Sequence, residues 1–154
     1  MAQINEDLDF EVRQEVWNIY ELEDGSTVRL RTILVKVLKT RKPPPGVPLG
    51  SKGMGLNLSL QNLLAVKSPL RLRGEPTKPI SQRAMLKLPK TEVKFNPFFE
   101  DWNIYLLKDG TELRVKVNVS SIERVEGKFD KFGNPMYNVQ SVPAITAKPP
   151  KKIG

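Results

Sequence analysis

The chain has 154 residues, with 25 Lys and Arg against 17 Asp and Glu, so its formal net charge is +8. It contains no Cys and no His, which excludes disulfides, thiol chemistry and the commonest metal ligand and general base. We therefore expect one compact, non-enzymatic domain with no catalytic residue, metal site or cofactor. Because no segment resembles a secretory signal or a membrane-spanning helix, we also expect a cytoplasmic protein with no membrane partner.

One unit of the chain occurs twice. The motif Trp-Asn-Ile-Tyr, followed by Asp-Gly, occupies residues 17–25 and returns at residues 102–110, which is 85 positions later. The chain has two Trp residues, and each begins one of these segments. We interpret the repetition as an internal duplication.

Each copy predicts a strand, a tight turn and a second strand. The Asp-Gly dipeptides at 24–25 and 109–110 are typical of hairpin turns, because Gly adopts the positive φ that these turns require. Successive residues of a strand point to opposite faces, so the Trp and Ile of each motif share one face, and the Asn and Tyr share the other. The side chains that we expect inside are Trp17, Ile19, Trp102 and Ile104.

The second strand of each copy differs in pattern. In the second copy, apolar and polar residues alternate from Leu113 to Ser120, as in a strand with one buried face. In the first copy, Ile33 and Val35 add apolar residues on the opposite face. We interpret this as a strand that is covered on both sides, and a β-bulge is the alternative.

A third strand is predicted in each copy. It lies at 136–142 after a turn, and at 56–61 in the first copy, where Gln61 aligns with Gln140. The preceding segment 42–55 is rich in Pro and Gly and is expected to be a long exposed loop. Between the copies, residues 80–88 fit a short helix or an edge strand equally well.

These elements predict an all-β protein that is internally duplicated. Two three-stranded antiparallel meanders, each marginal alone, are expected to pack as a six-stranded barrel or small sandwich and to form one compact domain. We divide the chain into a first β repeat, a basic Pro-containing connector, a second β repeat and a flexible basic tail. Their bounds are 11–67, 68–95, 96–146 and 147–154.

The positive charge is concentrated in the middle of the chain. Residues 41–94 carry eleven basic and two acidic side chains, and such a local field attracts phosphates or acidic protein surfaces. The repeats add outward-facing basic residues on two equivalent strands. The residues that we expect to bind nucleic acid are Arg29, Arg31, Arg41, Lys42, Arg71, Arg73, Arg114 and Lys116. The alternative is a solvated surface with cross-strand ion pairs and a connector that adds solubility.

Two functional hypotheses follow. The first is a non-enzymatic binding module for an anionic partner, either an acidic protein surface or, by preference, the nucleic-acid backbone without sequence specificity. The second is a structural or assembly protein whose duplicated β barrel mediates protein–protein contacts or self-association. Salt separates them, because phosphate binding weakens steeply with salt and apolar contacts do not.

Overall fold

The computed structural model describes residues 5–40 and 55–150. In these ranges the protein is all-β, as predicted, with ten strands in two antiparallel sheets. The six-stranded expectation is wrong, because each half of the chain contributes five strands instead of three, and no closed barrel is found in the described part. The strands are β1 (Asn5–Leu8), β2 (Phe10–Gln14), β3 (Trp17–Leu22), β4 (Thr27–Thr40), β5 (Leu56–Lys67), β6 (Lys90–Glu92), β7 (Phe95–Phe99), β8 (Asn103–Leu107), β9 (Glu112–Phe129) and β10 (Pro135–Lys148).

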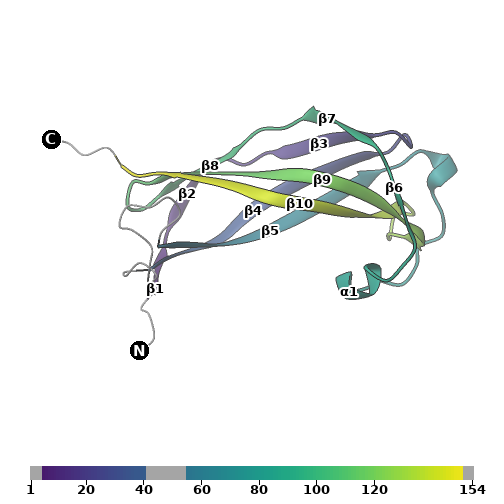
Figure 1. Cartoon of the computed structure of the whole chain (residues 1–154), viewed down its shortest axis with the longest axis horizontal. Helices are drawn as coiled ribbons and strands as arrows, with labels where there is room; N and C mark the ends of the chain where they lie inside the picture. The colour runs from purple at the N-terminus through teal and green to yellow at the C-terminus, as the bar shows by residue number, and fades with distance from the viewer. Residues whose placement is uncertain (1–4, 41–54, 151–154) are drawn as a thin grey trace.

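The sheets are layered face to face in an elongated sandwich (Figure 1). In the first sheet, β1 and β3 pair with one edge of the long strand β4, β7 pairs with β3, and β5 pairs with the other edge of β4. In the second sheet, β6 and β8 pair with one edge of β9, β2 pairs with β8, and β10 pairs with the other edge of β9. The strands β5 and β10 therefore end their sheets on one side, and the short strands β7 and β2 end them on the other.

The strand pairings of the first half recur in the second half. Ile19 pairs with Arg29 in the first sheet, and Ile104 pairs with Arg114 in the second, so both partners shift by 85 positions. The strands β2 and β7 correspond in the same way, but they are exchanged: β2 of the first half pairs with β8 of the second, and β7 pairs with β3. Each half thus supplies one strand to the sheet of the other.

The register also corrects the alignment of the third predicted strand. Lys36 pairs with Ser59, and its counterpart Ser121 pairs with Gln140, so β5 and β10 correspond at an offset of 81. Gln140 is therefore the counterpart of Ser59 and not of Gln61. The sequence alignment was wrong because two Gln residues were matched by identity, whereas hydrogen bonding to the neighbouring strand determines the position of an edge strand.

A β-bulge explains the apolar residues on both faces of β4. The register of β4 against β5 shifts between Leu34 and Lys36, which leaves Val35 as the additional residue. Val35 is 53% exposed, so the expected coverage on both sides is wrong. The corresponding shift in β9 leaves Ser120 as the additional residue. A bulge reverses the face to which the following residues of the strand point. The apolar residues before the bulge and those after it therefore pack into the same core.

The face of β3 and β8 that we expected inside is the half-buried outer face. Trp17 and Ile19 are half-buried, whereas Asn18 and Tyr20 are 6% and 1% exposed. The same inversion holds for Ile104 in β8 and for Trp102, which directly precedes that strand. The prediction failed because it ranked Trp and Ile above Asn and Tyr as core residues, although a polar side chain is readily buried when it has a hydrogen-bond partner.

The core consists of two clusters, each of which combines residues of both sheets. The first cluster contains Tyr20, Leu22, Val28, Leu30, Val93, Val117, Ile122 and Tyr137. The second contains Leu8, Leu34, Val37, Tyr105, Leu107, Leu113 and Val115, most of which are the counterparts of the first set. Neither half encloses a core without the other.

The segment between the halves contains little helix. A 3-10 turn η1 (Leu70–Leu72) follows β5, and α1 (Gln82–Met85) lies in the segment 80–88, which resolves the alternative there in favour of a helix. The Oγ atom of Ser81 caps α1 by accepting a hydrogen bond from the Ala84 amide. The first residues of the expected tail, 147–148, belong to β10. The loop expected at 42–55 lies outside the described residues apart from its last position.

Candidate functional site

The basic residues of the repeats lie on the outer faces of two different sheets. Arg29 and Arg31 are on β4, and Arg114 and Lys116 are on β9. Since the two sheets pack through their inner faces, these outer faces point away from each other. The structure therefore does not bring the four candidates together around one ligand.

Two of these four side chains form ion pairs within the protein. Arg31 donates to Glu15 Oε1 from Nε at 3.2 Å and from Nη2 at 3.0 Å, and its guanidinium lies 5.9 Å from the centre of the Trp17 ring. Arg114 pairs with Glu112 at 2.7 Å. Arg29 is exposed, Lys116 is half-buried, and neither forms an ion pair with a described residue.

Two further candidates, in the connector, hold neighbouring turns in place. The guanidinium of Arg71 donates to the carbonyl oxygen of Asp24, in the hairpin turn between β3 and β4. The guanidinium of Arg73 donates to the carbonyl oxygen of Phe132, in the turn before β10. Both arginines therefore have a structural use. The remaining candidates, Arg41 and Lys42, lie outside the described residues.

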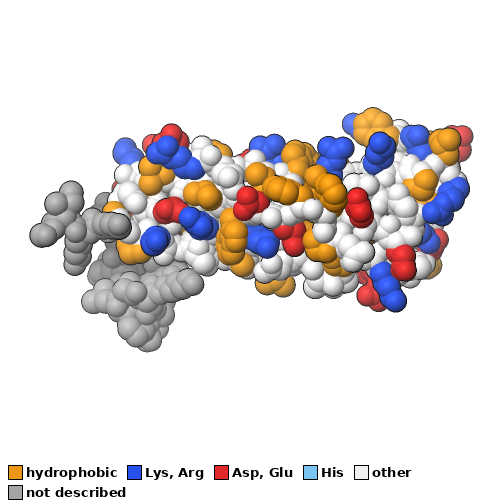
Figure 2. All heavy atoms as spheres, turned by 90° about the horizontal axis from the view of Figure 1, so that it is seen from above, with side chains coloured by type: hydrophobic (Ala, Val, Ile, Leu, Met, Phe, Trp, Pro, Cys, Tyr) orange, Lys and Arg blue, Asp and Glu red, His pale blue; other side chains and the backbone are white. Residues whose placement is uncertain are grey.

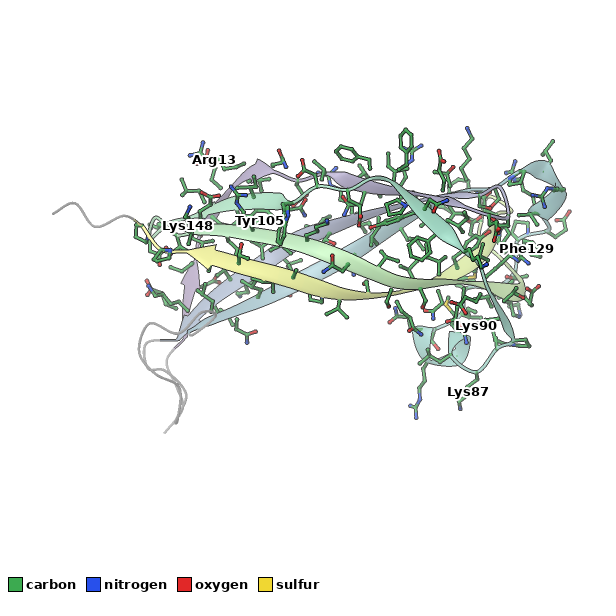
Figure 3. All side chains as sticks on the ribbon, turned by 45° about the horizontal axis from the view of Figure 1, so that its top comes forward. Arg13, Lys87, Lys90, Tyr105, Phe129 and Lys148 are labelled. Atoms are coloured by element: carbon green, nitrogen blue, oxygen red, sulfur yellow. The ribbon has the colours of Figure 1, made fainter. Side chains whose placement is uncertain are left out.

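The positive charge is spread over the described surface. Five of the 25 basic residues and none of the 17 acidic residues lie outside the described ranges, so the described part carries 20 basic and 17 acidic side chains. Arg13 and Lys148 lie towards one end of the molecule, and Lys87 and Lys90 lie beside α1 towards the other (Figure 3). On the face shown in Figure 2, basic side chains are interspersed with acidic ones, and hydrophobic side chains gather between them.

A buried polar cluster links the first hairpin turn to the second sheet. Asp24 Oδ2 accepts hydrogen bonds from the hydroxyl of Tyr137 at 2.6 Å and from Nη1 of Arg124 at 3.0 Å. The hydroxyl of Ser26 lies 2.9 Å from that of Tyr137 and 2.7 Å from that of Ser68. The polar groups of this cluster are hydrogen-bonded to one another.

Burial and hydrogen bonding shift the pKa values of Asp24 and Tyr137 in this cluster. Burial raises the pKa of the Asp24 carboxyl, but hydrogen bonds from Tyr137, Ser26 and Arg124 together hold it below its ordinary value. Burial raises the pKa of the Tyr137 hydroxyl, and its bond to the Asp24 carboxylate raises it further. The Asp24 carboxyl is thus kept ionised, which its ion pair with Arg124 requires. The Tyr137 hydroxyl is kept neutral, so that it can donate its hydrogen bond to Asp24.

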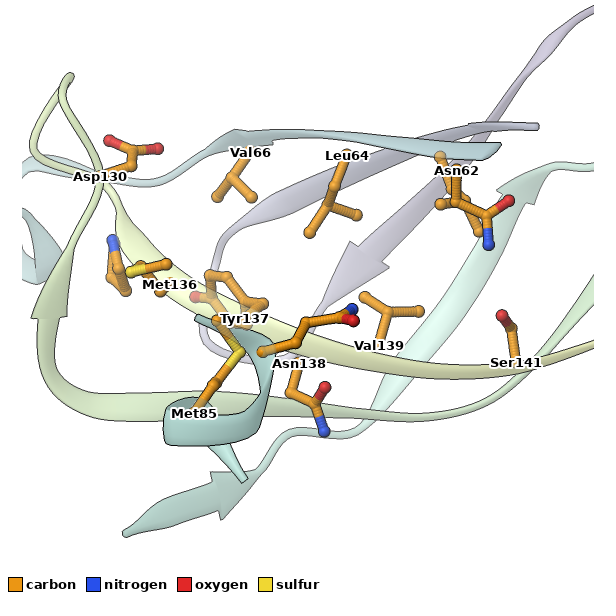
Figure 4. Close-up of a pocket in the computed structure, with 13 residues that line it drawn as sticks. Asn62, Leu64, Val66, Met85, Asp130, Met136, Tyr137, Asn138, Val139 and Ser141 are labelled. Carbon is orange, nitrogen blue, oxygen red and sulfur yellow. The ribbon is translucent and has the colours of Figure 1, made fainter. Parts of the chain in front are cut away.

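Two hollows lie between β5 and β10, one after the other along both strands. The first has a volume of about 370 Å³, and the second has about 580 Å³. In the first, Met85 of α1 points towards Tyr137 of β10, across from Leu64 and Val66 of β5 (Figure 4). The second is lined chiefly by Leu56, Leu58, Leu60, Pro143, Ile145 and Ala147.

The two hollows correspond to each other through the internal relation of the halves. Leu64 and Val66 of the first hollow have Ile145 and Ala147 of the second as counterparts, at the offset of 81. Leu64 and Ile145 are exposed to nearly the same extent, 41% and 40%. Both side chains point towards the core side of their sheets but remain exposed, because no described strand lies beyond β5 or β10.

The edges of β5 and β10 bear few charges. Lys67 is the one charged residue of β5, and Lys148 is the one charged residue of β10. We call the free edges of these two strands and the two hollows between them the open side of the sandwich. The alternation of Leu56, Leu58 and Leu60 predicted a strand here, but no signal in the sequence identified that strand as a sheet edge.

Comparison of the chain with protein-family models, with curated proteins and with solved structures finds no match. In the described ranges, no helix has the length and apolar character that a membrane crossing requires. The same ranges contain no group of three or more acidic side chains arranged to hold a metal ion.

Proposed function

We propose that this protein is a non-enzymatic assembly module that binds another polypeptide along its open side. The observation that carries the proposal is the pair of long edge strands, β5 with 12 residues and β10 with 14, each bearing a single charge and bordering an apolar groove. Proteins that work alone protect such edges with charges, prolines or covering segments, because an unpaired edge is a template for a further strand.

The sheet edges on the opposite side of the sandwich differ from β5 and β10, and this difference supports the assignment. There the sheets end in β2 and β7, which have five residues each. β2 carries the ion pair of Glu11 with Arg13, and β7 contains Pro97. Both strands thus have the features that discourage edge pairing. On the open side, β10 contains Pro143 and α1 borders the first hollow, whereas β5 has no proline and a single charge at its end.

We further infer that the two halves arose by internal duplication. The inference is supported by the repeated pairings, by the exchanged strands β2 and β7, and by the two corresponding hollows. A strand-exchanged homodimer whose subunits became fused accounts for all three. We also propose a cytoplasmic location, since the chain uses no disulfide.

The proposal is tested by capture of partners from an extract of cells that produce the protein naturally. Leu64→Lys combined with Ile145→Lys places two charges in the groove at positions that are 41% and 40% exposed. Val12→Lys, at a position that is 51% exposed on the opposite side, is the matched control. We expect the wild type and the control to retain the same identified polypeptide, and the groove variant to lose it. Equal retention by all three contradicts the proposal, provided that circular dichroism finds each variant folded.

An anionic partner remains a second proposal, supported by the outer face of the first sheet. Arg29 is exposed there, close to the stacked pair of Arg31 and Trp17, and Phe99, which pairs with Ile19, is 44% exposed. Arginine and aromatic side chains on one sheet face suit a nucleic-acid backbone with stacked bases. Titration with single- and double-stranded nucleic acid across a salt series tests this. The proposal predicts an affinity that decreases steeply with salt and decreases further in Arg29→Gln, and absence of binding at low salt contradicts it.

A further inference from the structure

We propose that the partner on the open side is a second copy of this chain, which pairs with the first through β5. The two β5 strands run antiparallel about a twofold axis, so that the first sheets of both copies join into one sheet of ten strands. This inference rests on the proposed function, because it names the polypeptide that the open side binds.

Among the described residues, nothing pairs with the backbone of β5 along most of its outer edge. In the described ranges, no backbone hydrogen bond joins β5 to a segment other than β4. The side-chain amide of Asn134 donates to the carbonyl oxygen of Val66 at 3.1 Å and so caps the end of the strand. Residues 56–65 remain available to a further strand.

The counterpart edge of β10 is interrupted by a proline. Pro143 pairs with Val117 of β9, and a proline fits into a ladder only where its nitrogen faces away from the neighbouring strand. That nitrogen therefore faces the free edge of β10, and it has no hydrogen to donate. The counterpart of Pro143 in β5 is Asn62, which retains its N–H. A strand added to β10 loses a hydrogen bond in the middle, whereas a strand added to β5 does not.

The available length suffices for a specific dimer. Antiparallel pairing of ten residues with ten residues forms on the order of ten backbone hydrogen bonds, as many as a typical stable interface contains. A twofold arrangement is self-complementary and places no like charges opposite each other, because residues 56–65 are uncharged. Leu63, which is 38% exposed, contributes apolar area on the outer face beside the new pair.

The test is the mass of the 154-residue chain in solution, measured by sedimentation velocity over a wide range of concentration. Gln61→Lys combined with Leu63→Lys places four positive charges on neighbouring positions across the twofold axis, on the solvent face of the sheet. The internal relation of the halves provides a matched control at the counterpart positions of β10, Val142→Lys combined with Ala144→Lys. Thermal unfolding of both variants establishes that they are folded.

We expect the wild type and the β10 variant to sediment as dimers, and the β5 variant as a monomer. A monomeric wild type at every concentration overturns the inference, and so does a dimer that persists in the folded β5 variant or is lost in the β10 variant. The proposed function fails separately. If the wild type is monomeric but the capture of another polypeptide still depends on Leu64 and Ile145, the open side binds a different partner, and only the second copy is excluded.

Discussion

The phenol of Tyr20 donates a hydrogen bond of 2.9 Å to the carboxylate of Glu100, which lies 80 positions further along the chain. The counterpart bond joins Tyr105 to Glu15 at 2.8 Å. Glu100 directly follows the exchanged strand β7, and Glu15 directly follows β2. Each bond therefore anchors the end of an exchanged strand to the half that receives it. Together, the two bonds connect each half of the chain to the other.

Removal of the hydroxyl group from either tyrosine should destabilise the whole domain. Tyr20→Phe leaves Glu100 without its donor, and the loss of a hydrogen bond to a half-buried carboxylate costs about 1–2 kcal/mol. We expect a loss of this size in the free energy of unfolding in urea, and a similar loss for Tyr105→Phe. A double-mutant cycle of Tyr20→Phe with Glu100→Gln isolates the pair. A coupling energy near zero would show that the bond contributes nothing.

Stability should decrease at alkaline pH because of the three tyrosines of the chain. Burial, together with an acceptor carboxylate, raises the pKa of Tyr20, Tyr105 and Tyr137 above the ordinary value of about 10. A folded-state pKa above the unfolded one stabilises the protein fully below about pH 10, and this contribution is lost as the pH rises through the folded-state pKa. We expect no tyrosinate absorbance in the native protein near pH 10, whereas the urea-unfolded protein titrates there. A native titration that coincides with the unfolded one contradicts this.

Stability should also decrease in acid, through Asp24. The pKa of its carboxyl lies below the unfolded value of 3.8, because the hydrogen bonds that it accepts outweigh its burial. Its contribution is present above pH 3.8 and is lost as the pH decreases through the folded-state pKa. We expect Asp24→Asn to flatten the dependence of the unfolding free energy on pH in this range, measured by urea titration at a series of pH values. An unchanged slope would exclude a role for this carboxylate.

The turn before β10 should tolerate no side chain at Gly133. This residue has φ +85°, and an added Cβ would lie 2.8 Å from the carbonyl oxygen of Gly74. Gly127 has a similar φ of +76° with open space around it, so Gly127→Ala incurs only the backbone strain, about 1–2 kcal/mol. We expect Gly133→Ala to lower the unfolding free energy by clearly more than this control. Equal losses would mean that the contact with Gly74 relaxes without cost.

Local features of the fold were predictable from the sequence, and its non-local features were not. The hairpin turns are confirmed, with Gly25 and Gly110 at φ +94° and +91°, because a turn depends on its own residues. The exchange of β2 and β7 was missed because pairing between segments so far apart in the chain, such as Phe10 with Leu107 and Leu22 with Phe95, leaves no periodic pattern in either strand. The inverted face of β3 was missed for the same reason: Asn18 is buried because its Oδ1 accepts a hydrogen bond from the distant Asp101 amide at 3.1 Å.

The candidate site was even less accessible to sequence reasoning. The sequence shows how many basic residues there are, but not the partners of individual side chains, such as Glu15 for Arg31. Charge counts are properties of composition, whereas an unpaired sheet edge is a property of topology. The edges of β5 and β10 became recognisable only once β4 and β9 were seen to pair with them on one side alone.

The most direct test of the open side as the interaction surface is site-specific photo-cross-linking. A benzoylphenylalanine residue replaces either Leu64 of β5 in the groove or Val12 on the opposite side, which are 41% and 51% exposed. Each protein is irradiated in an extract of its natural cells. We expect a covalent adduct with one identified polypeptide, either a second copy or another protein, from position 64 and none from position 12. Adducts from both positions alike, or none from position 64, would contradict the assignment of the open side.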